Sequence, residues 1–231
     1  DRSGKNLFVV FPCRTTYRET LFLQIKTGDV LRKPFHRRHH RRLWPFADRH
    51  IDMAAALDLR TGELREGQPE DRITMQVAVE YDPAATCPRW ERCVHEWFPD
   101  PDLADFVRRA LGYALTGRTT EQCFFAGFNP GAGGKTTMLR ALGYVLGDYA
   151  IETPFATFEL YQRTGIPNDL AALEGRRLIS ASETNDGTRL NEARIKSFTG
   201  SDLVSARFLH GEFFSFAPVG KLWLMFNHKP N

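Results

Sequence analysis

Nine consecutive residues carry the most distinctive chemical pattern in the chain. They are Asn129, Pro130, Gly131, Ala132, Gly133, Gly134, Lys135, Thr136 and Thr137. Small residues allow backbone N–H groups to converge on phosphate oxygens, and a helix that begins after them adds positive potential. In such a loop Lys135 is expected to reach the β- and γ-phosphates, and the Thr136 hydroxyl is expected to hold Mg²⁺. The pattern therefore predicts a nucleoside triphosphate site.

The loop departs at one position from the usual phosphate-loop pattern. Asn129 stands where the first glycine is expected. Asparagine adopts positive φ more readily than other residues that carry a side chain, so the turn is compatible with it. The alternative is an ordinary glycine-rich turn before a helix. We favour the phosphate loop because an apolar strand pattern precedes it and a helical pattern follows it in register.

Two further polar residues follow apolar strand patterns. Glu183 follows the run 178–182, and Asn227 follows the run 221–226. Open α/β sheets bind their ligands at the carboxyl ends of the strands. There Glu183 could orient or deprotonate water and bind the water shell of a metal ion, and Asn227 could sense the γ-phosphate. The alternatives are an acidic residue that caps a loop and a plain turn residue.

Strand and helix patterns alternate through the C-terminal half. The expected elements are strands at 122–127, 178–182 and 221–226, helices at 135–146 and about 190–199, and a hairpin of 203–209 with 213–216. This alternation predicts a largely parallel α/β sheet.

The N-terminal half predicts two helices and several short strands. The first helix begins at Pro88, and its apolar stripe consists of Trp90, Cys93, Val94 and Trp97. A second helix is expected from about 101 to 117, and short strands at 7–11, 21–25 and 73–79.

Composition places the chain among globular proteins. It has 231 residues and a net charge of +3, and no apolar run approaches the roughly 20 residues of a membrane span. The four cysteines form no C-x-x-C pair, which favours reduced thiols in a cytoplasm-like compartment. Basic residues and histidines crowd positions 32–42. This arm could bind a phosphate backbone, or it could be a solvated segment.

The order of motifs in the C-terminal half resembles the superfamily 3 helicase domain of phage and plasmid primase-helicases. The motifs are Gly127 to Thr137, Arg177 to Thr184, Leu190-Asn191-Glu192 through Lys196, Thr199 to Asp202, Ala206 to Leu209, and Phe226 to Pro230. The segment from about Ile51 to Gly117 resembles the poxvirus-primase-like region that precedes that domain in the same proteins.

The resemblance implies an AAA+-type P-loop ATPase core with a mainly parallel sheet, preceded by a small, mostly helical domain. It places the poxvirus-primase-like region at 51–120 and the ATPase core at 121–231, after the segment 1–50, which contains the basic arm and shows no clear pattern. It also implies that the arginine finger, which reaches the nucleotide of a neighbouring subunit, comes after Asn231.

The same resemblance assigns roles to the nucleotide-site residues. Lys135 and Thr136 would be the Walker A residues, Glu183 the Walker B acid and Asn227 the sensor 1 residue. Lys135, Glu183 and Asn227 would then act in catalysis, with Thr136 and Glu183 at the metal. The implied cofactors are ATP and Mg²⁺.

The resemblance also implies a ring, usually a homo-hexamer, that translocates on single-stranded DNA without sequence preference. The hairpin 203–216 would project into the channel, with His210 near its tip and Lys196 and Arg207 as further DNA contacts. The alternatives are an ion pair of Arg207 with Asp202 and a solvated helix face for Lys196.

Two other interpretations of the whole chain stay open. One is a P-loop protein of another class, such as a small-molecule kinase or a nucleotide-gated binding module. The arginine-rich lid that a kinase usually needs has no counterpart in 147–176. The other is a helicase fragment that folds but has lost activity. Under the favoured interpretation the protein acts on DNA in the cytoplasm of a bacterial or phage-infected host cell, away from membranes.

Overall fold

The computed structural model describes residues 7–10, 55–71, 73–77, 79–128, 133–160, 168–183, 189–200 and 202–227. The predicted strand at 21–25 and the basic arm at 32–42 lie outside these residues. Within the described part, no helix is both long and apolar enough to cross a membrane.

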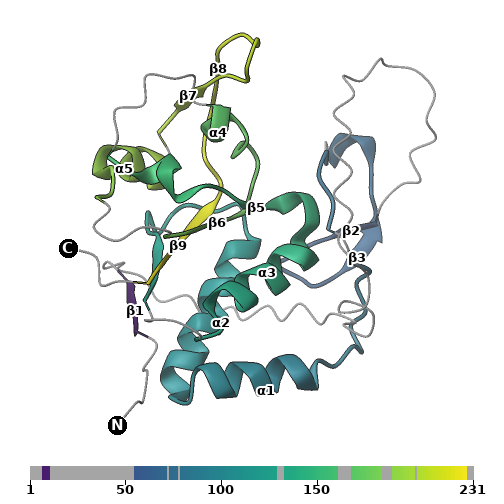
Figure 1. Ribbon diagram of the computed structural model, residues 1–231. Coiled ribbons are helices and arrows are strands. Elements are labelled where there is room, and N and C mark those ends of the chain that lie inside the picture. Colours follow the sequence, from purple (N-terminus) through teal and green to yellow (C-terminus); the bar gives the residue numbers. More distant parts are fainter. Residues whose placement is uncertain are drawn as a thin grey trace.

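A five-stranded sheet forms the centre of the molecule (Figure 1), with the strand order β1–β4–β9–β6–β5. Its strands are β1 (Leu7–Val10), β4 (Phe125–Phe128), β5 (Ala150–Glu152), β6 (Leu178–Ser182) and β9 (Lys221–Phe226). Strands β4, β9, β6 and β5 are parallel, and β1 pairs antiparallel with β4. The prediction of a largely parallel α/β sheet is confirmed.

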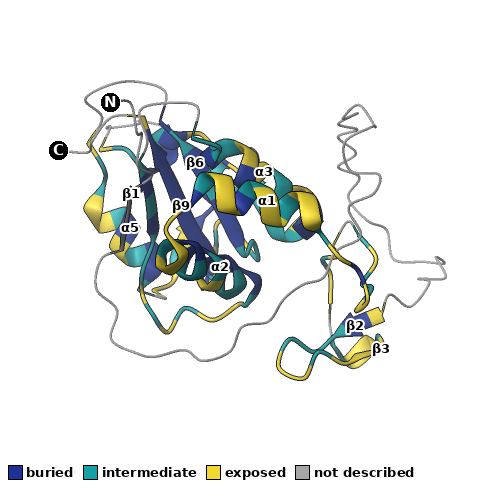
Figure 2. Ribbon diagram, turned by 90° about the horizontal axis from the view of Figure 1, so that it is seen from below, coloured by how far each residue is buried: buried dark blue, intermediate teal, exposed yellow. Residues whose placement is uncertain are grey.

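The central strands are buried on both faces, because alternate residues face two separate apolar cores. Trp223 and Met225 of β9 face the core formed with α1 (Pro88–Trp97), α2 (Pro101–Leu115) and α3 (Lys135–Leu146). Leu222, Leu224 and Phe226 face the core formed with the 3₁₀ turn η3 (Phe155–Phe158), α4 (Asn168–Ala171) and α5 (Glu192–Thr199). Figure 2 shows the buried sheet behind helices whose outer surfaces are exposed.

The helices begin where the sequence places helix-starting residues. Pro88 occupies the first turn of α1, and the Asp100 carboxylate accepts hydrogen bonds from the backbone N–H groups of Asp102 and Leu103 at the start of α2. The Asn191 side chain caps α5 in the same way. The predicted helices that begin at Pro88 and that span 135–146 are confirmed. Helix α2 ends about two residues before its predicted end at 117, and α5 begins about two residues after its predicted start at 190.

In the described part of the chain, two small antiparallel hairpins lie outside the main sheet. One pairs β2 (Ala55–Leu57) with β3 (Leu64–Glu66), followed by a 3₁₀ turn η1 (Pro69–Asp71). The other pairs β7 (Val204–Ala206) with β8 (Phe214–Phe216) and extends away from the sheet in Figure 1. The predicted hairpin is confirmed, although its strands are shorter than the predicted ones.

The prediction of a strand at 73–79 is wrong. The described residues of this segment carry no strand, and their backbone groups bond instead to the turn η2 (Gly147–Tyr149). Asp148 donates its N–H to the Gln76 carbonyl at 3.0 Å, and the Tyr149 hydroxyl donates to the Met75 carbonyl at 3.0 Å. A segment whose backbone groups bond to a turn in this way has no need of a neighbouring strand. Strand β5, with three residues, was not predicted because so short a run has no clear period.

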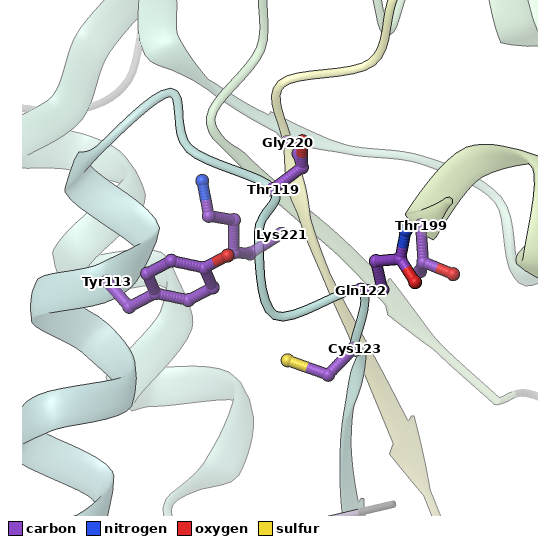
Figure 3. A pocket seen from close by; sticks show the side chains of 7 residues that line it. All are labelled: Tyr113, Thr119, Gln122, Cys123, Thr199, Gly220 and Lys221. Carbon is purple, nitrogen blue, oxygen red and sulfur yellow. The ribbon is translucent and has the colours of Figure 1, made fainter. Parts of the chain in front are cut away.

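Two cations join α2 to the amino-terminal edge of the sheet. Arg177, just before β6, donates to the Leu115 carbonyl at 2.8 Å, and Lys221, the first residue of β9, donates to the Thr116 carbonyl. Both carbonyls lie at the end of α2, where the helix dipole is negative. Figure 3 shows Lys221 beside the Tyr113 ring and near Cys123. Its Nζ lies 4.6 Å from the ring centroid.

This buried lysine gives the first prediction. Burial, followed by the charge of Arg177, lowers the pKa of Lys221 to about 7, whereas an unfolded lysine titrates near 10.4. Between about pH 7 and about pH 10.4 the Lys221 side chain is mostly neutral in the folded protein but protonated in the unfolded chain, so the free energy of unfolding rises with pH. Below about pH 7 Lys221 is protonated in both states, and burying its charge then destabilises the folded protein in full. Above pH 7, we expect the free energy of unfolding of the wild type to rise by up to about 1.4 kcal/mol per pH unit relative to that of Lys221→Met.

Urea unfolding of both proteins from pH 6 to pH 8.5 measures this difference. Burial raises the pKa values of Cys123 and Tyr113 as well, which lowers stability at high pH, but both proteins contain these groups. Parallel stability curves for the wild type and Lys221→Met would contradict the prediction.

Candidate functional site

Lys135 is the first residue of α3, and its side chain is buried at the carboxyl edge of the sheet. Its Nζ donates a hydrogen bond of 2.7 Å to the carbonyl of Phe226, the last residue of β9. Burial lowers the pKa of Lys135, and the negative charge of Glu183 opposes that effect. The ammonium group thus donates to a strand-end carbonyl and is electrostatically stabilised by the Glu183 carboxylate.

Glu183 and Asn227 lie side by side at the ends of neighbouring strands. Asn227 donates its backbone N–H to Glu183 Oε2 and its side-chain Nδ2–H to the Glu183 carbonyl, each at 3.1 Å. The Glu183 N–H in turn donates to the Met225 carbonyl at 2.8 Å. Glu183 is buried, and this paired arrangement fixes the direction of its carboxylate.

The sheet topology explains why these three residues meet. In the parallel register Ser182 of β6 pairs with Met225 of β9, so the residues that follow both strands emerge together. Phe128, the last residue of β4, pairs with Phe226. The loop after β4 therefore starts at the same edge, and α3 returns Lys135 to the end of β9. This edge is where open α/β sheets bind ligands.

The amino terminus of α3 supplies the remaining part of the site. Gly134 is the N-cap residue of this helix, has φ +75°, a left-handed conformation, and carries no side chain that could cap the first-turn N–H groups. Thr136 is half-buried and Thr137 is exposed in that turn. Such a helix start attracts anions. Residues 129–132 lie outside the described part, so the predicted roles of Asn129, Pro130, Gly131 and Ala132 stay predictions, as does that of Gly133.

The residues predicted to contact DNA lie in two places. Lys196, on α5, pairs with Glu192 at 3.8 Å, and both side chains are at least 80% exposed. His210 is exposed at the tip of the β7–β8 hairpin with φ +62°. Arg207 lies over the Phe213 ring, 4.6 Å from its centroid. Among the described ion pairs there is none between Arg207 and Asp202.

Two features of this region have no counterpart in the sequence interpretation. The Phe226 carbonyl holds Lys135, but a backbone group leaves no signal in the sequence. Trp97 packs against Gly134: a Cβ on that glycine would lie 2.4 Å from Trp97 Nε1. The apolar stripe that includes Trp97 was a signal for burial, but it did not indicate which element covers the ring.

Comparison with known proteins adds two findings. Residues 53–99 match the protein family described as "D5 N terminal like". Over 179 residues, which is 75% of this chain, the sequence is 27% identical to a protein of Acanthamoeba polyphaga mimivirus named as a "Putative helicase". The chain spans 19% of the length of that viral protein.

The family match lies inside the region 51–117, for which the sequence shows a resemblance to poxvirus-primase-like segments. It covers α1 and the β2–β3 hairpin. Together with the viral relative, it supports a relationship between this chain and D5-like helicases.

Proposed function

We propose that this chain contains the ATPase core of a superfamily 3 DNA helicase from the replication protein of a phage, plasmid or related mobile element. The observation that carries the proposal is the meeting of Lys135, Glu183 and Asn227 at the carboxyl edge of the parallel sheet. A cation, a buried acid and a neutral amide in one place, beside a glycine-capped helix start, match the needs of triphosphate hydrolysis.

The residues present suit ATP and Mg²⁺. The flexible stem of Lys135 allows its Nζ to exchange the Phe226 carbonyl for a phosphate oxygen, and the first turn of α3, whose N-cap residue is glycine, supplies N–H donors. The Thr136 hydroxyl and the Glu183 carboxylate are oxygen ligands of the kind that Mg²⁺ prefers, directly or through water. When bound, Mg²⁺ would neutralise charge that develops on the β- and γ-phosphates.

Within this proposal each side chain has a separate task. Lys135 binds the terminal phosphates and stabilises their charge. The Glu183 carboxylate orients the attacking water and accepts its proton as the bond to the γ-phosphorus forms. Asn227 orients the Glu183 carboxylate through its hydrogen bonds and contacts the γ-phosphate. The proton passes to Glu183, and ADP leaves with the electrons of the broken P–O bond.

The β7–β8 hairpin is the proposed DNA-contacting element. Its residue Phe213 is 64% exposed, and Arg207 lies over the Phe213 ring. The Arg207 Nε is buried and has no hydrogen-bond acceptor among the described residues. An exposed aromatic ring with an adjacent cation suits a single strand, whose bases stack and whose phosphates attract cations. In the proposal six copies form a ring whose hairpins, with His210 at each tip, face the DNA.

The test is ATP hydrolysis with and without single-stranded DNA, at low and at moderate salt, for the wild type and Lys135→Ala. We expect DNA to stimulate the wild type, the stimulation to fall with salt because phosphate contacts are screened, and the variant to be inactive. ATP binding without any stimulation by DNA would favour a P-loop protein of another class. Absence of both binding and hydrolysis would contradict the proposal.

A further inference from the structure

Trp97 lies against the last glycine before Lys135. A Cβ built on Gly134 would come within 2.4 Å of Nε1, 2.5 Å of Cε2 and 2.6 Å of Cδ1 of the Trp97 indole. No real side chain tolerates such distances, so the indole occupies the space beside the Gly134 backbone. Gly134 also has φ +75°, a conformation that disfavours side chains independently. Glycine is therefore required at this position for two reasons, and Trp97 is one of them.

The indole is itself held firmly. Trp97 is the last residue of α1, and the next N–H, that of Phe98, donates to the Val94 carbonyl at 2.8 Å. Trp90, two turns earlier, meets the Trp97 ring edge-on with 6.0 Å between ring centroids. Val94 and Phe98 are buried in the core that α1 shares with α3 and the sheet. Trp97 thus presents a rigid surface to Gly134.

Gly134 caps α3, so its position sets the direction of the first-turn N–H groups and of Lys135. We propose that Trp97 is a positioning residue for nucleotide binding, which fixes the end of the phosphate loop from the D5-like segment. The inference rests on the proposed function. It also couples α1 to the nucleotide site, because a ligand bound at the start of α3 favours the same position of Gly134 that Trp97 favours.

The α1–α2 region is anchored at the opposite edge of the sheet as well. There Arg177 donates to the Leu115 carbonyl, and its guanidinium carbon lies 4.3 Å from the Tyr149 ring centroid. Loss of this anchor weakens the attachment of the helices without touching the phosphate loop. Arg177→Met is therefore a matched control, which separates general stability from positioning of the loop.

The experiment is a calorimetric titration of the full chain with a nonhydrolysable ATP analogue and Mg²⁺. We expect Trp97→Ala to raise the Kd by about tenfold, because small misplacements of binding groups are costly. Trp97→Phe keeps a flat ring on Gly134 and should remain within about threefold of the wild type. Arg177→Met should lower the Tm and leave the Kd unchanged.

Tryptophan fluorescence provides the second readout. Nucleotide binding should change the fluorescence emission of the wild type, and this change should be absent from Trp97→Phe. This readout tests the role of Trp97 even if the Trp97→Ala variant fails to fold. Equal Kd values for the wild type and a folded Trp97→Ala, or an unaltered emission change in Trp97→Phe, would overturn the inference and leave the proposed function intact. A wild type that binds no nucleotide would overturn both.

Discussion

Replacing Glu183 by glutamine is expected to slow ATP hydrolysis by orders of magnitude while the protein still binds ATP. Glutamine has almost the same shape, and its side-chain oxygen can still accept the hydrogen bond that the Asn227 N–H donates to Glu183 Oε2 at 3.1 Å. What it cannot do is accept a proton from the attacking water. General-base contributions are typically factors of 10² to 10⁴, so we expect the hydrolysis rate to fall by about that amount.

A matched control removes the same charge from the surface. Glu192 on α5 is 83% exposed and pairs with Lys196 across one helical turn, so Glu192→Gln should hydrolyse ATP at the wild-type rate. Single-turnover hydrolysis and nucleotide binding are measured for both variants. A Glu183→Gln protein that hydrolyses ATP at more than about a tenth of the wild-type rate would show that another group activates the water.

Replacing Lys135 by methionine is expected to weaken triphosphate binding by about 10- to 100-fold, because hydrogen bonds to charged groups contribute about 1.5 to 3 kcal/mol. Methionine retains most of the apolar stem in the buried space that Lys135 fills. Burial lowers the pKa of Lys135, which means that its charge is costly in the absence of a ligand. We therefore expect the Tm of the variant to equal or exceed that of the wild type.

Loss of affinity together with retained stability is the signature of a binding residue. Lys196→Met serves as the control, because Lys196 is 80% exposed and pairs only weakly with Glu192. Titration with ATP and thermal unfolding, carried out on both variants, separate the two effects. If Lys135→Met unfolded at a clearly lower temperature and bound ATP as tightly as the folded wild type, Lys135 would be a structural residue.

The sequence predicted those parts of the fold whose signals are local. The helix at 135–146 and the strands at 178–182 and 221–226 have the predicted bounds, because each combines a clear apolar pattern with glycine or a polar residue at its end. Since parallel strands end at a common edge, the same patterns indicated that Glu183 and Asn227 lie close to each other. The hydrogen bonds between them agree with that expectation.

Long-range contacts were not predictable in the same way. Lys221 begins a strand and reads as a solvent-facing cation, yet it is almost fully buried because the end of α2 offers it the Thr116 carbonyl. The contact of Trp97 with Gly134 likewise joins two elements that are separate in the sequence. An apolar stripe reveals which face of a helix is buried, but the partner of that face depends on the tertiary fold.

These long-range contacts attach helices α1 and α2 to both edges of the sheet. The end of α2 is joined to the amino-terminal edge through Arg177 and Lys221. The end of α1 reaches the carboxyl edge, where Trp97 lies against Gly134. The segment that matches the D5 family and the proposed nucleotide site therefore share one packed core.

The position of Lys135 Nζ in a crystal structure with Mg²⁺ and a nonhydrolysable ATP analogue tests the central claim most directly. We predict that Nζ leaves the Phe226 carbonyl, to which it now donates at 2.7 Å, and donates instead to a β- or γ-phosphate oxygen. Glu183 should then face the γ-phosphate, with Asn227 still bonded to it. A structure in which Lys135 stays on the Phe226 carbonyl while the nucleotide binds elsewhere would contradict the account.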